Sequence, residues 1–197
     1  MVISAELVKT LREMSGAGIM DCKEALEETS GNIDTAIDYL RKKGASKAVK
    51  KAERTASEGL ICSYIHPGNK IGVLVEVNCE TDFVARTEQF QLLAKDISMQ
   101  IAASNPLYVK REDIPPEVIN KEKEIYINQA KELGKTGNVI EKIADGKMEK
   151  YYSEVCLIEQ SFIRDQDITI RELIARKIAE LGENIKVGRF SRFQLGK

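Results

Sequence analysis

Apolar residues in the first fifty positions recur at helical spacing and predict three short helices. The first stripe follows Ser4, which can cap a helix, and is broken by "SGAG"; its members are Leu7, Leu11 and Met14. The second stripe ends at Gly31, and the third runs from the capping residue Asn32 to Gly44. A module of this size buries little apolar surface, so we expect it to act as a docking piece on a larger body.

The period of the pattern changes to two between Leu60 and Asn78, which predicts a β-hairpin with its turn at "HPGNK". After "TDFVART" the helical spacing returns and predicts a long helix that "SNP" stops. The apolar positions of this helix are Phe90, Leu93, Ala94, Ile97 and Ile101. The hairpin and the helix are expected to pack as two layers.

Two charged helices then predict a protruding helical hairpin over about residues 116–157. Pro116 suits the first turn of the first helix, and the second begins near Asn138. A further helix is expected after Gly146.

The last part of the chain predicts one more helix and a strand. Thr169 and Glu172 have the spacing of a capping box, and Gly182 ends the helix that follows. The alternating segment "NIKVGRFSRFQLG" predicts a final strand. The fold class is therefore α+β: a three-helix docking module with its linker over residues 1–54, then an antiparallel-sheet core domain with packed helices over residues 55–197.

Charge and composition narrow the possible functions. Thirty Lys and Arg against 31 Asp and Glu leave no overall attraction to nucleic acid or to an anionic membrane. The chain has no apolar run near the ~20 residues that span a bilayer, and its start lacks the features of a signal peptide. We therefore expect a cytoplasmic protein without membrane or direct nucleic-acid partners.

The segment "KAVKKAER" leaves one alternative open, because Lys47, Lys50, Lys51 and Arg54 gather within two helical turns. A nucleic-acid contact here predicts an affinity that falls steeply with salt. The favoured interpretation is a solvated helical linker, since no aromatic residues are interleaved for stacking.

Enzymatic and metal chemistry have little support in the sequence. The four cysteines form no C-x-x-C pair, so we expect buried thiols rather than a metal or redox site. The only histidine, His66, lies in the predicted turn and is expected at the surface. Without a nucleophile motif or a phosphate-binding loop, the sequence predicts no catalytic residue, no bound metal and no cofactor.

The stretch "NCETDFVART" places a charged Asp82 beside an apolar Phe83 where a strand gives way to a helix. Phe83 could be the first core residue of the helix and Asp82 an ordinary helix-start charge, and the pattern alone favours this interpretation. Alternatively, both side chains point outward and enter a partner.

The chain resembles bacterial translation elongation factor Ts in several long motifs. "VKTLREMSGAGIMDCKEAL" and "VEVNCETDFVAR" are similar to the two signatures of that family, and "GKMEKYYSEVCLIEQSFIRD" and "GENIKVGRF" are similar to its carboxy-terminal part. The chain departs from the usual family residues at Ile19, Ser161 and Thr87. The likeness runs almost end to end and corresponds to a short form with a single core.

The resemblance implies a nucleotide-exchange factor that binds elongation factor Tu with GDP and disturbs its Mg²⁺ site. It also implies a ubiquitin-associated-like fold for the three-helix module. The residues implied at the Mg²⁺ site are Thr81, Asp82, Phe83 and Val84, and those implied in docking are Arg12, Ile19 and Met20. An alternative for Ile19 and Met20 is that they close the small core of the module.

The single core also predicts a homodimer, because longer members of the family carry a duplicated core that a short chain can supply by pairing with itself. The final strand offers Phe190, Phe193 and Leu195 as an apolar surface, with Arg189 and Arg192 around it. The alternative is that Phe193 lies in the core of the monomer.

Overall fold

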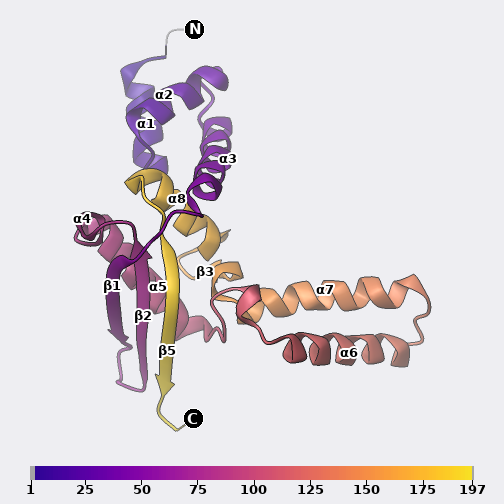
Figure 1. Ribbon diagram of the computed structural model, residues 1–197. Coiled ribbons are helices and arrows are strands. Elements are labelled where there is room, and N and C mark those ends of the chain that lie inside the picture. Colours follow the sequence, from indigo (N-terminus) through magenta and orange to yellow (C-terminus); the bar gives the residue numbers. More distant parts are fainter. Residues whose placement is uncertain (1–2, 197) are drawn as a thin grey trace. The chain divides into compact units, whose positions relative to one another are not determined.

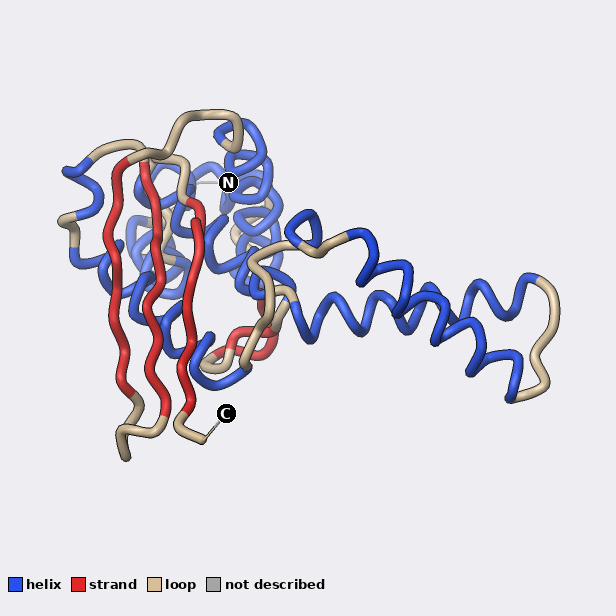
Figure 2. The backbone as a smooth tube through the Cα atoms, turned by 60° about the horizontal axis from the view of Figure 1, so that its bottom comes forward, coloured by secondary structure: helices blue, strands red, loops and turns tan. Residues whose placement is uncertain are grey.

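The computed structural model describes residues 3–196 and has the expected α+β fold, with antiparallel strands and many helices. Strands β1 (Glu58–Ile65), β2 (Ile71–Cys79) and β5 (Lys186–Gln194) lie side by side in the order β1-β2-β5, as Figure 2 shows. The chain divides into two compact units. Unit 1 comprises Met1–Cys62, Val75–Asp96 and Arg171–Gly188, and unit 2 comprises Ser63–Leu74, Ile97–Ile170 and Arg189–Lys197.

Within unit 1, the predicted three-helix module is confirmed as α1 (Ala5–Ser15), α2 (Ile19–Glu28) and α3 (Ile33–Lys51) (Figure 1). Ser4 and Asn32 cap α1 and α3 by accepting backbone N–H groups of the first turn, at 3.2 and 3.0 Å. The small core of the module consists of Leu11, Cys22, Ala25, Leu26 and Ala36.

The prediction that the third helix ends at Gly44 was wrong, because α3 continues for seven residues beyond it, to Lys51. Gly44 is buried, and a β-carbon at this position would lie 3.8 Å from the β-carbon of Ala179 in α8 (Ile170–Leu181). A β-carbon here would make only an ordinary van der Waals contact, so Gly44 lies where α3 packs on α8 and does not end the helix.

The predicted hairpin is confirmed as β1 and β2, and the predicted last strand as β5. Every second residue of β2 is buried, namely Val73, Val75, Val77 and Cys79, so the strand has one covered face. In unit 2, the Leu195 N–H donates to the Lys70 carbonyl at 2.8 Å, which joins the end of β5 to the start of β2.

The long helix after the hairpin is confirmed as α5 (Glu88–Ser104). It does not include "TDFV", which forms its own turn, α4 (Asp82–Ala85). Thr87 separates the two helices, because its hydroxyl donates to the Val84 carbonyl at 2.7 Å and accepts the Phe90 N–H at 3.3 Å. A short side chain that bonds the backbone in this way favours a helix start over a continuous helix.

Unit 2 contains the predicted helical hairpin, formed by α6 (Pro116–Glu132) and α7 (Asn138–Val155), which lie side by side in Figures 1 and 2. The prediction of a new helix after Gly146 was wrong, since α7 passes through this glycine without a break. Apart from its chain neighbours and the backbone of its own helix, no atom of residues 3–196 lies within 4 Å of the position of a β-carbon at Gly146. The glycine lowers the helix propensity at this position, but α7 continues through it.

Arg111 lies before this hairpin, in the short helix η1 (Arg111–Asp113), and binds residues near the end of α7. Its guanidinium binds the carboxylates of Glu149 and Glu159, at 2.7 and 2.5 Å, and lies 4.3 Å from the centre of the Tyr152 ring. These hydrogen bonds raise the pKa of Arg111 and lower that of the Glu149 carboxyl. The segment before α6 is thereby tied to α7 and to the turn η2 (Leu157–Glu159).

The remaining strands, β3 (Ser161–Phe162) and β4 (Asp165–Thr169), form a small antiparallel pair in unit 2. Gln100 joins this pair to α5: its amide donates to the Ser161 carbonyl at 3.1 Å and accepts the Ile163 N–H at 2.9 Å. The predicted end of the last helix at Gly182 is confirmed by its positive φ of 81° and by its N–H bond to the Ile178 carbonyl. Within residues 3–196, no helix combines the length and apolarity that crossing a membrane requires.

Candidate functional site

The turn that carries the candidate residues Thr81, Asp82, Phe83 and Val84 leaves the end of β2 and forms α4 in unit 1. Phe83 is 78% exposed, Thr81 is exposed, and Asp82 and Val84 are half-buried. Ala85 is buried and fastens the turn to the molecule. The structure therefore brings the four residues together and directs the Phe83 ring away from the protein's own core.

The local backbone of this turn is held by Thr81. Its hydroxyl caps α4 by accepting the Val84 N–H at 3.4 Å, and the Ala85 N–H donates to the Thr81 carbonyl at 3.3 Å. Thr81 is also hydrogen-bonded to Glu183, a residue that the sequence pattern did not single out. The exposed phenylalanine thus stands on a turn with defined geometry.

Asp82 forms an ion pair with Arg86, one helical turn further on, with 2.7 Å between Oδ2 and Nη2. The Arg86 and Asp82 side chains are 78% and 45% exposed, so solvent screens this pair; it adds little stability and can exchange partners easily. The spacing of four residues is the signal in the sequence that could have indicated Arg86.

Cys79 lies directly before this turn and is fully buried. Its thiol donates to the Thr81 carbonyl at 3.1 Å. Burial raises the pKa of the Cys79 thiol, so the group stays neutral at pH 7 and packs as a small apolar side chain. The exposed turn is therefore anchored on a buried residue.

The second set of candidate residues lies on α1 and α2 of the helical module. Ile19 and Met20 are 57% and 75% exposed at the start of α2, and Arg12 is exposed on α1. The alternative that Ile19 and Met20 close the core of the module is therefore wrong. Met14 of α1, which the periodic pattern places in the core stripe, is also exposed.

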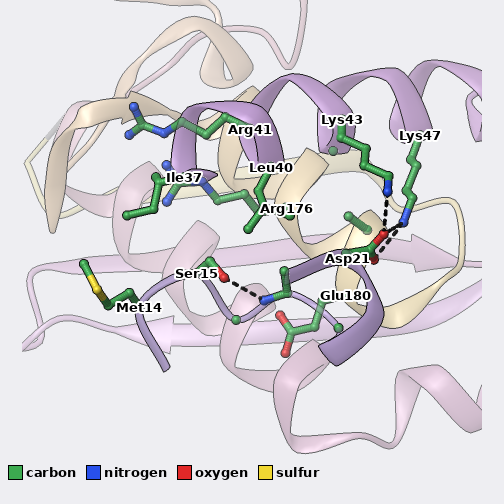
Figure 3. A pocket seen from close by; sticks show the side chains of 15 residues that line it. Met14, Ser15, Asp21, Ile37, Leu40, Arg41, Lys43, Lys47, Arg176 and Glu180 are labelled. Atoms are coloured by element: carbon green, nitrogen blue, oxygen red, sulfur yellow. Dashed lines mark hydrogen bonds and ion pairs between the residues drawn. The ribbon is translucent and has the colours of Figure 1, made fainter. Parts of the chain in front are cut away.

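A cavity of about 230 Å³ lies beside this module within unit 1, and Figure 3 shows its lining. Met14 reaches one side of it, and Arg176 and Glu180 of α8 lie on another. In its lining, Asp21 binds both Lys43 and Lys47. This pairing indicates a structural role for the charges of the cavity.

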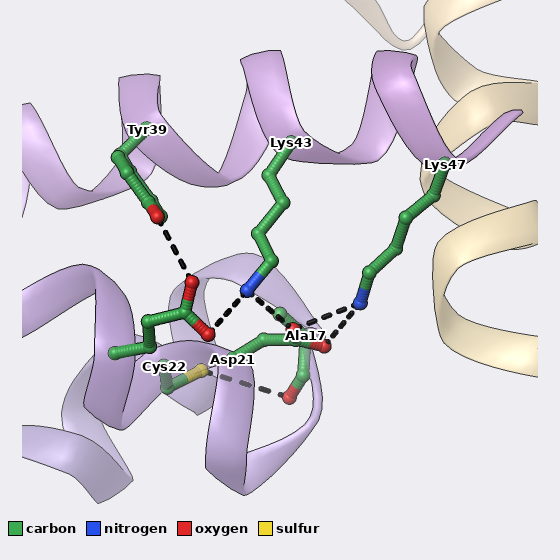
Figure 4. Close-up of polar contacts among 7 residues, drawn as sticks. Ala17, Asp21, Cys22, Tyr39, Lys43 and Lys47 are labelled. Atoms are coloured by element: carbon green, nitrogen blue, oxygen red, sulfur yellow. Dashed lines mark hydrogen bonds and ion pairs between the residues drawn. The ribbon is translucent and has the colours of Figure 1, made fainter. Parts of the chain in front are cut away.

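These charges belong to a network between α2 and α3 that Figure 4 shows. Lys47 donates to both carboxylate oxygens of Asp21, at 2.8 and 2.9 Å, and Lys43 lies 3.0 Å from Asp21. Lys43 and Tyr39 also donate to Glu24, at 2.6 and 3.0 Å. The hydrogen bond from Lys47 is the main reason why the pKa of Asp21 lies below its usual value. The network joins α3 to α2, the helix that begins with Ile19 and Met20.

The basic segment is largely engaged inside the protein. Lys47 binds Asp21, the Lys51 ammonium donates to the Gly182 carbonyl at 2.5 Å, and Arg54 lies 3.5 Å from Glu80. Three of its four cations thus have intramolecular partners, so the segment is less solvated than the predicted solvated linker.

The cysteines and the histidine lie where ordinary packing places them. Cys22, Cys79 and Cys156 are buried as expected, whereas Cys62 is only half-buried. Burial raises the pKa of the Cys156 thiol to about 11. His66 is exposed in the hairpin turn, as predicted, and its Nδ1 lies 3.0 Å from the Tyr64 hydroxyl.

Comparison with known proteins assigns the family. A family profile described as Elongation factor TS matches residues 5–197. A protein of Syntrophomonas wolfei named Elongation factor Ts is 60% identical over 196 residues, which cover 100% of this chain and 92% of the relative. Proteins of the same name from Caldanaerobacter subterraneus and Carboxydothermus hydrogenoformans are 58% and 56% identical, covering 100% of this chain and 98% and 90% of those relatives. The chain belongs to the elongation factor Ts family.

Proposed function

We propose that this protein binds elongation factor Tu carrying GDP and promotes GDP release by disturbing the Mg²⁺ site of that GTPase. Its family membership makes it a nucleotide exchange factor of translation elongation. The single observation that carries the finer proposal is the exposure of Phe83, 78%, on a capped turn with a carboxylate beside it. Thr81, Asp82, Phe83 and Val84 form the inserting element, which we call the tip.

The chemistry of the tip suits this task. In a GTPase, Mg²⁺ bridges phosphate oxygens with strict octahedral geometry and few protein ligands, so small displacements of its surroundings weaken binding. Burial of the Phe83 ring between elements of the partner supplies about 1.5–3 kcal/mol. Asp82 can leave its exposed pair with Arg86 and accept hydrogen bonds from the partner.

Exchange of this kind needs no covalent step, so the proposal assigns no catalytic residue, metal or cofactor to this chain. Its thermodynamic form is negative coupling: the factor weakens GDP binding, and GDP weakens binding of the factor by the same ratio. Each tenfold change in affinity corresponds to about 1.4 kcal/mol of coupling free energy.

The test is the release of labelled GDP from elongation factor Tu with and without this protein. We expect faster release in its presence, and a weaker response when Mg²⁺ has already been removed with a chelator. Unchanged release with Mg²⁺ present contradicts the exchange function. Equal acceleration with and without Mg²⁺ contradicts only the Mg²⁺ mechanism.

A second part of the proposal is that Arg12, Ile19 and Met20 dock on the same GTPase. The support is the exposure of Ile19 and Met20 at the start of α2 and of Arg12 on α1. We also propose that residues 1–54 form a separable docking module and 55–197 the core domain. Removal of residues 1–50 should weaken binding to the partner and leave the rest folded; unchanged affinity contradicts the docking role.

A third part of the proposal is a homodimer formed through the sheet. In unit 2, Phe193 and Leu195 are 69% and 76% exposed, which removes the alternative of a Phe193 buried in the monomer. Phe193 lies in β5, and Leu195 directly follows the last residue of that strand, Gln194. Ile65 and Leu74 are also exposed apolar residues of the strands in this unit. A second copy of the chain is the occupant that the single core suggests.

Sedimentation equilibrium at micromolar concentration tests this part. We expect the mass of a dimer, and dissociation with Phe193→Glu, which places a charge among apolar side chains. Leu133→Glu is the matched control, because Leu133 is equally exposed but lies after α6. A monomer mass for the unaltered chain excludes the dimer, and an unchanged dimer with Phe193→Glu locates the interface elsewhere.

A further inference from the structure

The Glu183 carboxylate accepts three hydrogen bonds from Thr81, the first residue of the tip, and from Glu80 directly before it. Its Oε2 accepts the backbone N–H groups of Glu80 and Thr81, at 3.1 and 3.0 Å. Its Oε1 accepts the Thr81 hydroxyl at 2.6 Å. One side chain, about a hundred residues away in sequence, thus contacts both residues that precede Asp82 and Phe83.

These donors need such an acceptor because of where they lie. Strand β2 ends at Cys79, so the N–H groups of Glu80 and Thr81 come after the last residue of that strand. A carboxylate satisfies both of them, and hydrogen bonds to an ionised group are stronger than those between neutral groups. The Thr81 hydroxyl donates to Glu183 while it accepts the Val84 N–H. The geometry of α4 therefore depends on the position of the Glu183 carboxylate.

The position of Glu183 is itself fixed by its neighbours. Gly182 ends α8 with a φ of 81°, a conformation that favours glycine, and turns the chain toward the tip. Asn184, the residue after Glu183, is 2% exposed, and its N–H donates to Glu80 Oε1 at 2.6 Å. Its side-chain amide donates to the Arg54 carbonyl at 2.7 Å. Glu80 and Glu183 thus bind each other's segments reciprocally.

We propose that Glu183 is a positioning residue for nucleotide exchange: it orients the turn that presents Asp82 and Phe83, and thereby sets the rate of GDP release. This inference rests on the proposed function. When the turn is ordered before contact, its insertion into the partner costs less conformational entropy. We therefore expect Glu183 to change the rate of GDP release at saturating concentrations of this protein more than the affinity for the partner. Glu183 itself does not enter the partner.

The first experiment examines the free protein by amide hydrogen exchange. With Glu183→Ala, the amides of Glu80 and Thr81 should exchange at least about tenfold faster, while amides of α5 stay protected. Glu183→Gln should keep most of the protection, because its amide oxygen can still accept both N–H groups. Glu132→Gln, at the exposed end of α6, is the charge-matched control and should change neither amide. Unchanged protection in Glu183→Ala overturns the proposal.

The second experiment measures GDP release with Glu183→Ala, Phe83→Ala and the double variant. If Glu183 acts through the tip, Glu183→Ala alone lowers the maximal rate about tenfold, and it adds little once Phe83 is absent. Equal losses in both backgrounds reveal general destabilisation and overturn the positioning role. Failure of Phe83→Ala itself to slow release refutes the tip as inserting element, which is a different outcome. Should Glu183→Ala fold poorly, Glu183→Asp replaces it, because its carboxylate is one methylene further from the Glu80 and Thr81 donors, and it must show the same coupling to Phe83.

Discussion

Two phenylalanines only seven residues apart have opposite environments. Phe83 is 78% exposed on α4, whereas Phe90 is fully buried on α5. Thr87 separates them by ending the first turn and capping the second helix. Residue type therefore does not decide burial here: the phenylalanine on α5 contributes to the core, whereas the one on α4 is available to a partner.

The largest effect is expected for Phe90→Ala, which removes a fully buried ring. The variant should lose about 3–5 kcal/mol of the free energy of unfolding, because a cavity adds to the lost transfer energy. Urea unfolding followed by circular dichroism measures this loss. If the free energy of unfolding falls by less than about 1 kcal/mol, the surrounding side chains fill the cavity. Phe90 and Phe83 then differ less in their contribution to stability than their burial indicates.

Phe83→Ala should produce the opposite result. We expect a change in stability within about 0.5 kcal/mol, as for other exposed positions. GDP release should slow by about 10- to 100-fold, since the burial of one ring in the partner is lost. Leu133→Ala, another exposed apolar residue, is the control and should leave release unchanged. If Phe83→Ala is strongly destabilised and GDP release is normal, Phe83 acts in the core and not in the partner contact.

The cysteines show whether the exposed turn is also rigid. Cys79 is buried beneath the tip, whereas Cys62 is half-buried on β1. A thiol reagent at pH 8 should modify Cys62 at least about tenfold faster than Cys79, because only opening of the structure exposes the latter. Mass spectrometry of digested protein measures both rates, and denaturant should make all four cysteines reactive. Similar rates in the native protein mean that the turn opens frequently.

The smallest effect is expected for the acid stability of the helical module. In this module the exposed Ile19 and Met20 are followed in the chain by Asp21, which belongs to a charged network. The Lys47 and Lys43 ammonium groups lower the pKa of Asp21 in the folded protein. A carboxyl with a depressed pKa stabilises the fold above its unfolded pKa of about 3.9 and loses this contribution as the pH falls through the folded value. The module should therefore weaken below about pH 4.

Amide signals of α2 and α3 followed by NMR from pH 6 to pH 3 measure this loss. Asp21→Asn should make the pH dependence shallower, whereas Asp34→Asn, an exposed residue in the first turn of α3, should not. Identical acid profiles for the unaltered protein and Asp21→Asn show that the Asp21 network does not hold the module.

The α+β class, the hairpin, the helical hairpin and the last strand could be predicted from the sequence, because these depend on local periodicity and turn residues. The sequence also indicated the family, through motifs that run nearly end to end. Its errors were at Gly44 and Gly146, where a glycine suggested a boundary inside a continuous helix. The hydrogen-bond ladder of a helix continues past one glycine at a cost of about 1 kcal/mol, and packing decides whether it does.

Which apolar residues are exposed could not be predicted from the sequence and depends on the packing of distant segments. Phe83, Met14 and Phe193 fit core patterns in the sequence but are exposed, since burial depends on what covers a face and not on the face alone. The contacts of Glu183 were equally invisible, because its partners Glu80 and Thr81 lie about a hundred residues earlier. Local patterns report the elements of a fold, whereas long-range hydrogen bonds and covering surfaces exist only once the chain has brought distant segments together.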